Sequence, residues 1–108
     1  MMPYSVSCAA LNQLTRSLAV SLAKNGIRVN AISLGSIMSS SLRLNLHSNP
    51  ELQDSIIDAT PLGYIAEPAE VAELALFLSS ESASFLTGQV ITIDGGRSIL
   101  NKLEKAAY

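Results

Sequence analysis

Two short apolar segments constrain the fold of this chain more than any other feature. Residues 27–32 (IRVNAI) and 89–93 (QVITI) are rich in β-branched residues with apolar positions alternating along them, which predicts two β-strands. Each segment follows a helical segment and a glycine turn, so the two strands are expected to pair in parallel. A parallel sheet needs cover on both faces and neighbours at both edges. The pattern therefore predicts an α/β fold whose sheet is incomplete with two strands alone.

The first helical segment covers residues 5–25, which contain neither proline nor glycine. Gly26 follows it and supplies a helix stop, because glycine adopts the left-handed backbone conformation at little steric cost. Apolar side chains recur along the segment at spacings of three and four, which predicts an apolar stripe that can serve both as core against the sheet and as an oligomer face. The stripe comprises Ala10, Leu11, Leu14, Leu18 and Leu22.

The middle of the chain predicts a loop and three helical pieces. Residues 33–41 form a serine-rich loop around a single glycine. Residues 42–59 are expected to be helical in two pieces, because Asn49 precedes Pro50 and a residue before proline avoids the helical region. Pro68 begins a further helix that extends to about residue 79, since proline suits the first helical turn.

Composition and charge exclude several classes of function. Hydrophobic residues make up 48% of the 108-residue chain and charged residues 15%, enough apolar material for a core. The net charge of −2 is scattered, which argues against nucleic acid or anionic membrane as a partner. Cys8 has no second cysteine to pair with, and His47 alone is a poor start for a metal site or a general base. With no signal peptide and no apolar run long enough to span a membrane, the expected location is cytoplasmic.

Five segments, taken in order over nearly the whole chain, resemble the short-chain dehydrogenase/reductase family. Each is weakly specific alone, but their order and separations together are strongly specific. The resemblance is to the subgroup that contains 3-oxoacyl carrier-protein reductases, and it implies the C-terminal portion of a doubly wound, Rossmann-like parallel sheet. The segments are Tyr4–Ser5–Val6–Ser7–Cys8, residues 26–30 (GIRVN), residues 34–37 (LGSI), Glu67–Pro68 with Val71–Ala72, and residues 87–96 (TGQVITIDGG).

The resemblance assigns Tyr4 to the family's catalytic acid/base position and Cys8 to its lysine position. In the family a tyrosine and a lysine four residues later share one helical face. The phenol exchanges a proton while hydride passes between the nicotinamide and a carbonyl carbon. The ammonium favours the phenolate and holds the nicotinamide ribose.

Cysteine at the lysine position decides what chemistry to expect. A free phenol has a pKa of about 10 and is a poor base at neutral pH. A cation ~4 Å from a phenolate is worth about 4 kcal/mol at an effective dielectric near 20, so its loss costs more than tenfold even if screening halves it. A thiol supplies neither the charge nor the donors for a ribose. The chain is therefore expected to be catalytically deficient on its own, with Cys8 a small apolar residue of a helix.

The resemblance also locates part of a cofactor site, for NAD or NADP, in residues 33–39. It implies that the backbone of Ile37 meets the nicotinamide carboxamide and that Ser39 stands near a family threonine. Leu34 and Gly35 stand where the family carries Pro-Gly, so one fixed φ angle is lost. The family's Gly-rich phosphate loop has no match in this sequence. Cofactor binding by this chain alone is therefore not expected.

The expected organisation has four parts. Residues 1–32 supply the active-site helix and strand, 33–60 the substrate and nicotinamide loop region, 61–96 a helix and the last strand, and 97–108 a polar, frayed tail. By resemblance, residues 5–25 and 89–96 are where family members build oligomer contacts.

Three hypotheses for function follow. The first is an oxidoreductase-family chain that acts on small carbonyl or alcohol substrates. The second is a non-catalytic association module that pairs with itself or with a full-length relative. The third is a truncated family member with no selected function.

Overall fold

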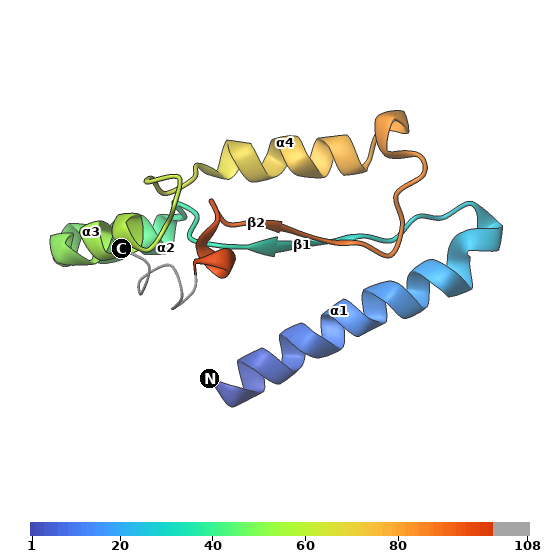
Figure 1. Ribbon diagram of the computed structural model, residues 1–108, viewed down its shortest axis with the longest axis horizontal. Coiled ribbons are helices and arrows are strands. Elements are labelled where there is room, and N and C mark those ends of the chain that lie inside the picture. Colours follow the sequence, from blue (N-terminus) through green and yellow to red (C-terminus); the bar gives the residue numbers. More distant parts are fainter. Residues whose placement is uncertain (101–108) are drawn as a thin grey trace. The chain divides into compact units, whose positions relative to one another are not determined.

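The computed structural model describes residues 1–100, so the expected tail at 101–108 lies outside the described residues. Figure 1 shows the elements in chain order. They are α1 (Met2–Leu22), η1 (Ala23–Asn25), β1 (Ala31–Leu34), α2 (Ser40–Ser48), α3 (Pro50–Asp58), α4 (Pro68–Leu78), η2 (Glu81–Ala83), β2 (Val90–Ile93) and η3 (Arg97–Ile99).

The two strands β1 and β2 pair in parallel (Figure 1). The Ala31 N–H donates to the Gln89 carbonyl at 2.8 Å, and the Gly35 N–H donates to the Ile93 carbonyl at 3.0 Å. Both partner numbers rise together along the chain, which is the register of a parallel ladder. The predicted α/β fold with a parallel pair of strands is confirmed.

The first strand begins later than its sequence predicts. The apolar pattern starts at residue 27, whereas β1 starts at Ala31. The Val29 N–H donates to the side-chain oxygen of Thr87 at 3.1 Å instead of to a backbone carbonyl. A side chain therefore takes the place of a ladder partner just before β1. The predicted second strand, by contrast, coincides with β2 to within one residue.

The predicted helix boundaries agree well with the structure. Gly26 ends the first helical segment with φ 73°, and its N–H donates to the Ala23 carbonyl at 2.9 Å. The two predicted pieces around Asn49–Pro50 are α2 and α3, and Pro68 begins α4. The first helix extends further toward the N-terminus than the apolar stripe indicates, since α1 begins at Met2. Tyr4 and Cys8 therefore both lie on a helix.

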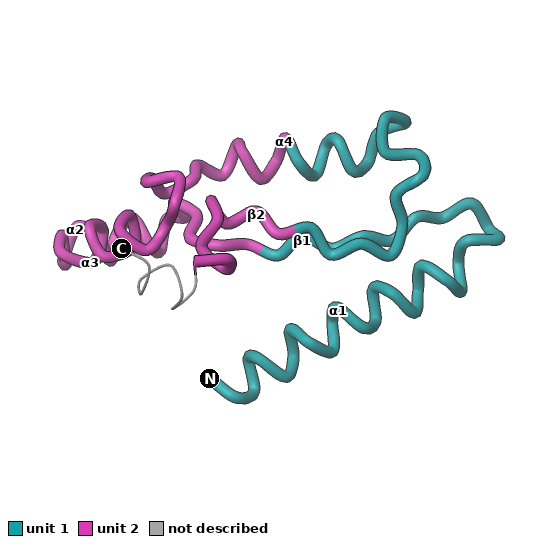
Figure 2. The backbone as a smooth tube through the Cα atoms, in the orientation of Figure 1, with its two compact units in different colours: residues 1–33, 74–91 teal, residues 34–73, 92–108 magenta. Residues whose placement is uncertain are grey.

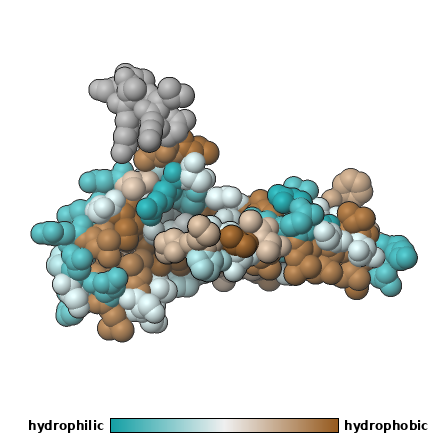
Figure 3. Space-filling view, turned by 90° about the horizontal axis from the view of Figure 1, so that it is seen from below, coloured by the Kyte–Doolittle hydropathy of each residue, from teal (hydrophilic) through white to brown (hydrophobic). Residues whose placement is uncertain are grey.

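The described chain forms two compact units (Figure 2). Unit 1 comprises residues 1–33 and 74–91, and unit 2 comprises residues 34–73 with the residues from 92 onward. Apolar side chains are exposed in both, and the brown surface in Figure 3 shows many of them. The buried residues of unit 1 are Thr15, Ala19, Leu78 and Ala83, and those of unit 2 are Leu46, Thr60 and Ile65.

The most buried residues of α1 are Thr15 and Ala19, which lie beside the leucine stripe and not within it. Thr15 and Ala19 are only 5% and 3% exposed, and the Ala19 side chain lies 3.3 Å from where a Cβ on Gly88 would stand. The Thr15 hydroxyl donates to the Leu11 carbonyl at 2.9 Å, so its burial leaves no unsatisfied polar group. Of the predicted stripe, Leu11, Leu14 and Leu18 are exposed and Leu22 is half-buried, so packing against the sheet and contact with another chain both stay predictions.

Gly35 lies where no other residue fits without a shift of backbone. A Cβ at this position would stand 2.6 Å from the Asp94 Cβ and 2.7 Å from the Asp94 Cα, both within unit 2. We expect Gly35→Ala to lower the free energy of unfolding by about 1–3 kcal/mol, the usual cost of overpacking a tight contact. Urea denaturation followed by circular dichroism measures this value.

Ser40→Ala is the matched control, because Ser40 is an exposed residue in the same unit. It should change the free energy of unfolding by less than about 0.5 kcal/mol. An unfolding midpoint for Gly35→Ala equal to that of the unmodified chain would show that residues 35 and 94 do not approach closely.

Candidate functional site

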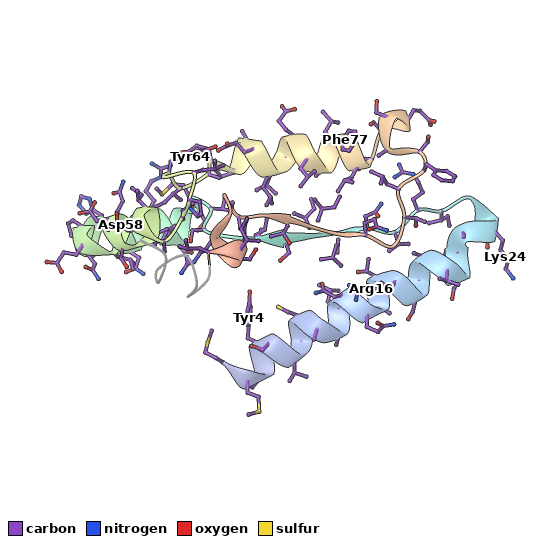
Figure 4. The ribbon with its side chains drawn as sticks, in the orientation of Figure 1. Tyr4, Arg16, Lys24, Asp58, Tyr64 and Phe77 are labelled. Carbon is purple, nitrogen blue, oxygen red and sulfur yellow. The ribbon has the colours of Figure 1, made fainter. Side chains whose placement is uncertain are left out.

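Tyr4 and Cys8 lie one turn apart in the first half of α1, in unit 1. Residues four apart share a helical face, so the structure brings the two side chains to one face as the sequence predicts. Tyr4 is 67% exposed and projects from the helix (Figure 4). Cys8 lies on the helix, as expected, and carries an exposed free thiol.

Residues 34–39 of the loop that was expected to meet the cofactor lie in unit 2 and are held at both ends. Leu34 is the last residue of β1, and the Gly35 N–H donates to Ile93 beside the close contact with Asp94. Ile37 forms an isolated parallel bridge with Ala66. The Met38 N–H donates to the Ala66 carbonyl at 2.8 Å. The backbone of the loop is therefore fixed by two neighbouring segments.

Ser39 has a structural task that sequence analysis missed. It is the N-cap residue of α2, and its side-chain oxygen accepts a hydrogen bond from the Leu42 N–H at 3.2 Å. Its own N–H donates to the Ile37 carbonyl at 2.7 Å. A serine just before a helical pattern is a recognised cap signal, so the sequence did contain the information.

The turn after β2 completes this part of unit 2. The Asp94 carboxylate accepts hydrogen bonds from the Gly96 N–H at 2.9 Å and the Ser98 N–H at 2.8 Å. Arg97 Nη1 donates to the Ser36 side chain at 3.1 Å, which ties the turn to the loop. Hydrogen bonds from Ser98, from its side chain and then its backbone, together with the one from Gly96, lower the pKa of Asp94 below its ordinary value.

A small cavity of about 70 Å³ lies between this turn and the loop, within unit 2. At its edge the Tyr64 hydroxyl donates to Glu70 Oε1 at 2.7 Å, and the Glu67 N–H donates to Glu70 Oε2 at 2.8 Å. The second bond is one half of a capping box, because a Glu at the third helical position reaches back to the N-terminus of α4. The lining residues are Ser36, Ile37, Thr60, Leu62, Tyr64, Ala66, Glu70, Ile93, Asp94 and Gly95.

The Tyr64–Glu70 hydrogen bond shifts the pKa of both side chains. Donation by Tyr64 is the main reason that the pKa of Glu70 is lowered from 4.5. The same bond to Glu70 is the main reason that the pKa of Tyr64 is raised from 10.0. The sequence contains both residues but no pattern that pairs them.

The pH dependence of stability should reveal this bond. Because the pKa of Glu70 is lowered in the folded chain, its contribution is present above pH 4.5 and is lost as pH falls through the lowered value. Because the pKa of Tyr64 is raised, its contribution is present below pH 10.0 and is lost as pH rises through the raised value. Urea midpoints of the unmodified chain and Tyr64→Phe should therefore differ most between these limits and converge at both extremes. A difference that does not vary with pH would contradict the bond.

Comparison with known proteins identifies the family. The profile described as enoyl-(acyl carrier protein) reductase matches residues 1–98. Solved structures of short-chain dehydrogenases match the same arrangement of elements. The protein from Francisella tularensis subsp. tularensis SCHU S4 has a TM-score of 0.80 and 38% identity, covering 89% of this chain and 43% of that one. The chain belongs to the short-chain dehydrogenase/reductase family.

Other members of the family give the extent of the match. Galactitol 2-dehydrogenase (L-tagatose-forming) from Cereibacter sphaeroides is 42% identical over 96 residues, which are 89% of this chain and 37% of the relative. The structure of a 4-hydroxyisoleucine dehydrogenase complexed with NADH has a TM-score of 0.83 and 34% identity, over 91% of this chain and 40% of that one. The chain thus spans about two fifths of the length of these relatives.

Within residues 1–100, no helix is both long and apolar enough to cross a membrane. The same range contains no group of three or more histidine, cysteine, aspartate or glutamate residues placed to hold a metal ion.

Proposed function

We propose that this chain corresponds to the C-terminal portion of a family oxidoreductase that acts on carbonyl or alcohol substrates with NAD or NADP, and that it is catalytically deficient on its own. The observation that carries the proposal is the pair on α1. Tyr4 occupies the acid/base position, and Cys8, four residues later on the same helical face, occupies the lysine position. The pair supplies a phenol but no cation.

The residues of the loop fit the nicotinamide end of such a cofactor. Gly35 keeps the loop backbone close to Asp94, and Ile37 lines the cavity beside it. When bound, the dinucleotide supplies or accepts the hydride at its nicotinamide ring. We assign the Ile37 backbone to hold the carboxamide, with the Ser39 hydroxyl nearby; that hydroxyl can still donate a hydrogen bond, because its oxygen acts only as an acceptor toward Leu42. Leu34, where the family has proline, leaves the loop entry without a fixed φ angle.

The residues present do not fit the pyrophosphate end. A dinucleotide pyrophosphate binds at a Gly-rich turn that opens a helix, where backbone N–H groups point at the phosphates. Gly95 and Gly96 follow a strand, but η3 after them is a single short turn, and Gly35 is isolated. Affinity for the whole cofactor is therefore expected to be low in this chain alone.

A calorimetric titration tests this proposal. We expect the purified chain to give no saturable heat with NADH or NADPH at ligand concentrations up to ~1 mM, which corresponds to less than about 4 kcal/mol of binding free energy. A complete family dehydrogenase serves as the positive control. Binding in the micromolar range by the chain alone would contradict the proposed deficiency.

The finer expectations from sequence belong to the same proposal. The division at residues 32, 60 and 96 and the likeness to 3-oxoacyl carrier-protein reductases follow from the resemblance, and a cytoplasmic location is proposed from the sequence pattern alone. The net charge of −2, with no basic cluster in the sequence, gives no reason to propose nucleic acid as a partner.

A second candidate function, association with another copy or with a complete relative, is favoured by the exposed apolar residues of α1. Leu11, Leu14 and Leu18 lie on one face of that helix and are 58%, 51% and 38% exposed. Contiguous apolar surface of this kind marks interaction sites in folded proteins. Homo-oligomers or mixed oligomers are the assemblies proposed.

Sedimentation velocity tests the association. We expect Leu14→Glu to weaken self-association about tenfold, since a buried charge without a partner costs more than 1.4 kcal/mol. Gln13→Glu is the matched control, because Gln13 is an exposed polar residue that points away from the three leucines on the same helix. A monomeric unmodified chain, alone and mixed with a complete relative, would refute this candidate.

A further inference from the structure

A groove of about 390 Å³ lies beside the nicotinamide loop, entirely within unit 2. Its lining comes from the loop and from the facing sides of α2 and α3. The lining residues are Met38, Arg43, Leu46, His47, Pro50 and Gln53.

The polar side chains that line the groove are hydrogen-bond donors and not carboxylates. Arg43, His47 and Gln53 each bring N–H donors, and none of the lining residues carries a carboxylate. A guanidinium presents a planar fork of donors that matches the two oxygens of a carboxylate. Apolar side chains form the rest of the wall. Such a lining suits a small molecule that has an anionic head and a short carbon body.

We infer that this groove binds the carboxylate of the substrate, so that the substrate class is a small hydroxy or oxo acid rather than a neutral polyol or ketone. The inference rests on the proposed function in one respect. Met38 lies between Ile37 and Ser39, the two residues assigned to the nicotinamide, so the groove begins beside the residues proposed to hold that ring.

The Glu67 carboxylate forms an ion pair with the Arg43 guanidinium. Arg43 Nη2 lies 3.7 Å from Glu67 Oε2, and the two side chains are 66% and 60% exposed. An exposed ion pair at this distance is weak and is readily exchanged for another carboxylate. Glu67 therefore acts as a competitor for Arg43, and its removal should strengthen substrate binding.

A matched pair of ligands tests the inference in solution. Galactonate and galactitol share one carbon chain and differ in a carboxylate against a hydroxymethyl group. We expect galactonate, titrated into the isotope-labelled full chain, to shift the NMR amide signals of Arg43 and His47, and galactitol to bind at least about threefold more weakly, as expected for one exposed charge interaction.

Substitutions of Arg43 and of Glu67 should change the affinity for galactonate in opposite directions. Arg43→Gln should weaken galactonate binding about threefold to tenfold, and Glu67→Gln should strengthen it by about twofold or more. His47→Gln keeps an N–H donor and should reduce binding less than Arg43→Gln. Arg16→Gln, an exposed arginine of α1 in unit 1, is the control and should leave binding unchanged.

Equal binding of the two ligands, unchanged binding in a folded Arg43→Gln chain, or no shifts with either ligand would overturn the inference. Circular dichroism establishes that each variant is folded. Galactonate binding requires no hydride transfer and no dinucleotide. Tight NADH binding by this chain would therefore contradict the proposed deficiency alone, whereas loss of the galactonate preference would contradict this inference alone.

Discussion

Replacement of Cys8 by lysine is expected to raise the activity of a hybrid dehydrogenase more than tenfold. In the hybrid, residues 1–98 of this chain replace the matching segment of the Cereibacter galactitol 2-dehydrogenase, which then supplies the rest of the fold. A cation ~4 Å from the Tyr4 phenolate is worth about 4 kcal/mol at an effective dielectric near 20, and screening that halves this value still leaves more than a tenfold effect. The measurement is the rate of cofactor reduction at saturating cofactor, with galactonate and galactitol each supplied as the alcohol, because the groove at residues 38–53 of the hybrid comes from this chain.

Two further variants show whether the charge or the length of the side chain at position 8 restores activity. Cys8→Met restores the length of the side chain without a charge and should leave the hybrid as inactive as the cysteine form. Tyr4→Phe in the Cys8→Lys background should abolish the restored activity, because it removes the hydroxyl that would carry the proton. A cysteine hybrid as active as the lysine variant would show that this fold does not need a cation one turn from the phenol.

Removal of the Arg28 guanidinium is expected to cost about 3 kcal/mol of stability, because three backbone carbonyls lose a charged donor. Arg28 Nη1 donates to the Leu78 carbonyl at 2.8 Å and to the Leu86 carbonyl at 3.3 Å, and Nη2 donates to the Ser80 carbonyl at 3.2 Å. Leu78 is the last residue of α4, where carbonyls have no partner within the helix. The side chain therefore ends the helix and joins it to the segment before β2, all within unit 1.

Arg28→Met keeps most of the apolar stem and removes the donors, so urea denaturation of this variant reports the hydrogen bonds. Arg28→Lys should recover about half of the loss, since an ammonium offers donors but not the planar fork. Arg16→Met, at an exposed position of α1, should change the free energy of unfolding by less than about 0.5 kcal/mol. A cost below about 1 kcal/mol for Arg28→Met would mean that water replaces the guanidinium at those carbonyls.

The helices and the last strand were predictable because their signals act over a few residues. Gly26 can take a positive φ angle, Asn49 before Pro50 cannot continue a helix, and Pro68 suits a first turn. Each of these effects arises from backbone sterics next to the residue itself. The pairing of Tyr4 with Cys8 belongs to the same class, since a spacing of four on a helix places both on one face.

Contacts between distant segments were not predictable in the same way. The start of β1 at Ala31 depends on a hydrogen bond from Val29 to Thr87, 58 positions away. The pairing of Tyr64 with Glu70 is closer in sequence but follows no periodic pattern. Neither bond follows from local propensity, because each depends on the path of the residues between the two partners.

From the order of its residues alone, this chain determines its helices, its β2 strand, its family and the missing charge beside Tyr4. Tertiary structure alone decided that Thr15 and Ala19, rather than Leu11, Leu14 and Leu18, are buried in unit 1, and that Gly35 lies against Asp94. The physical reason is that propensity and spacing act along the backbone, whereas burial depends on which surface a neighbouring segment covers.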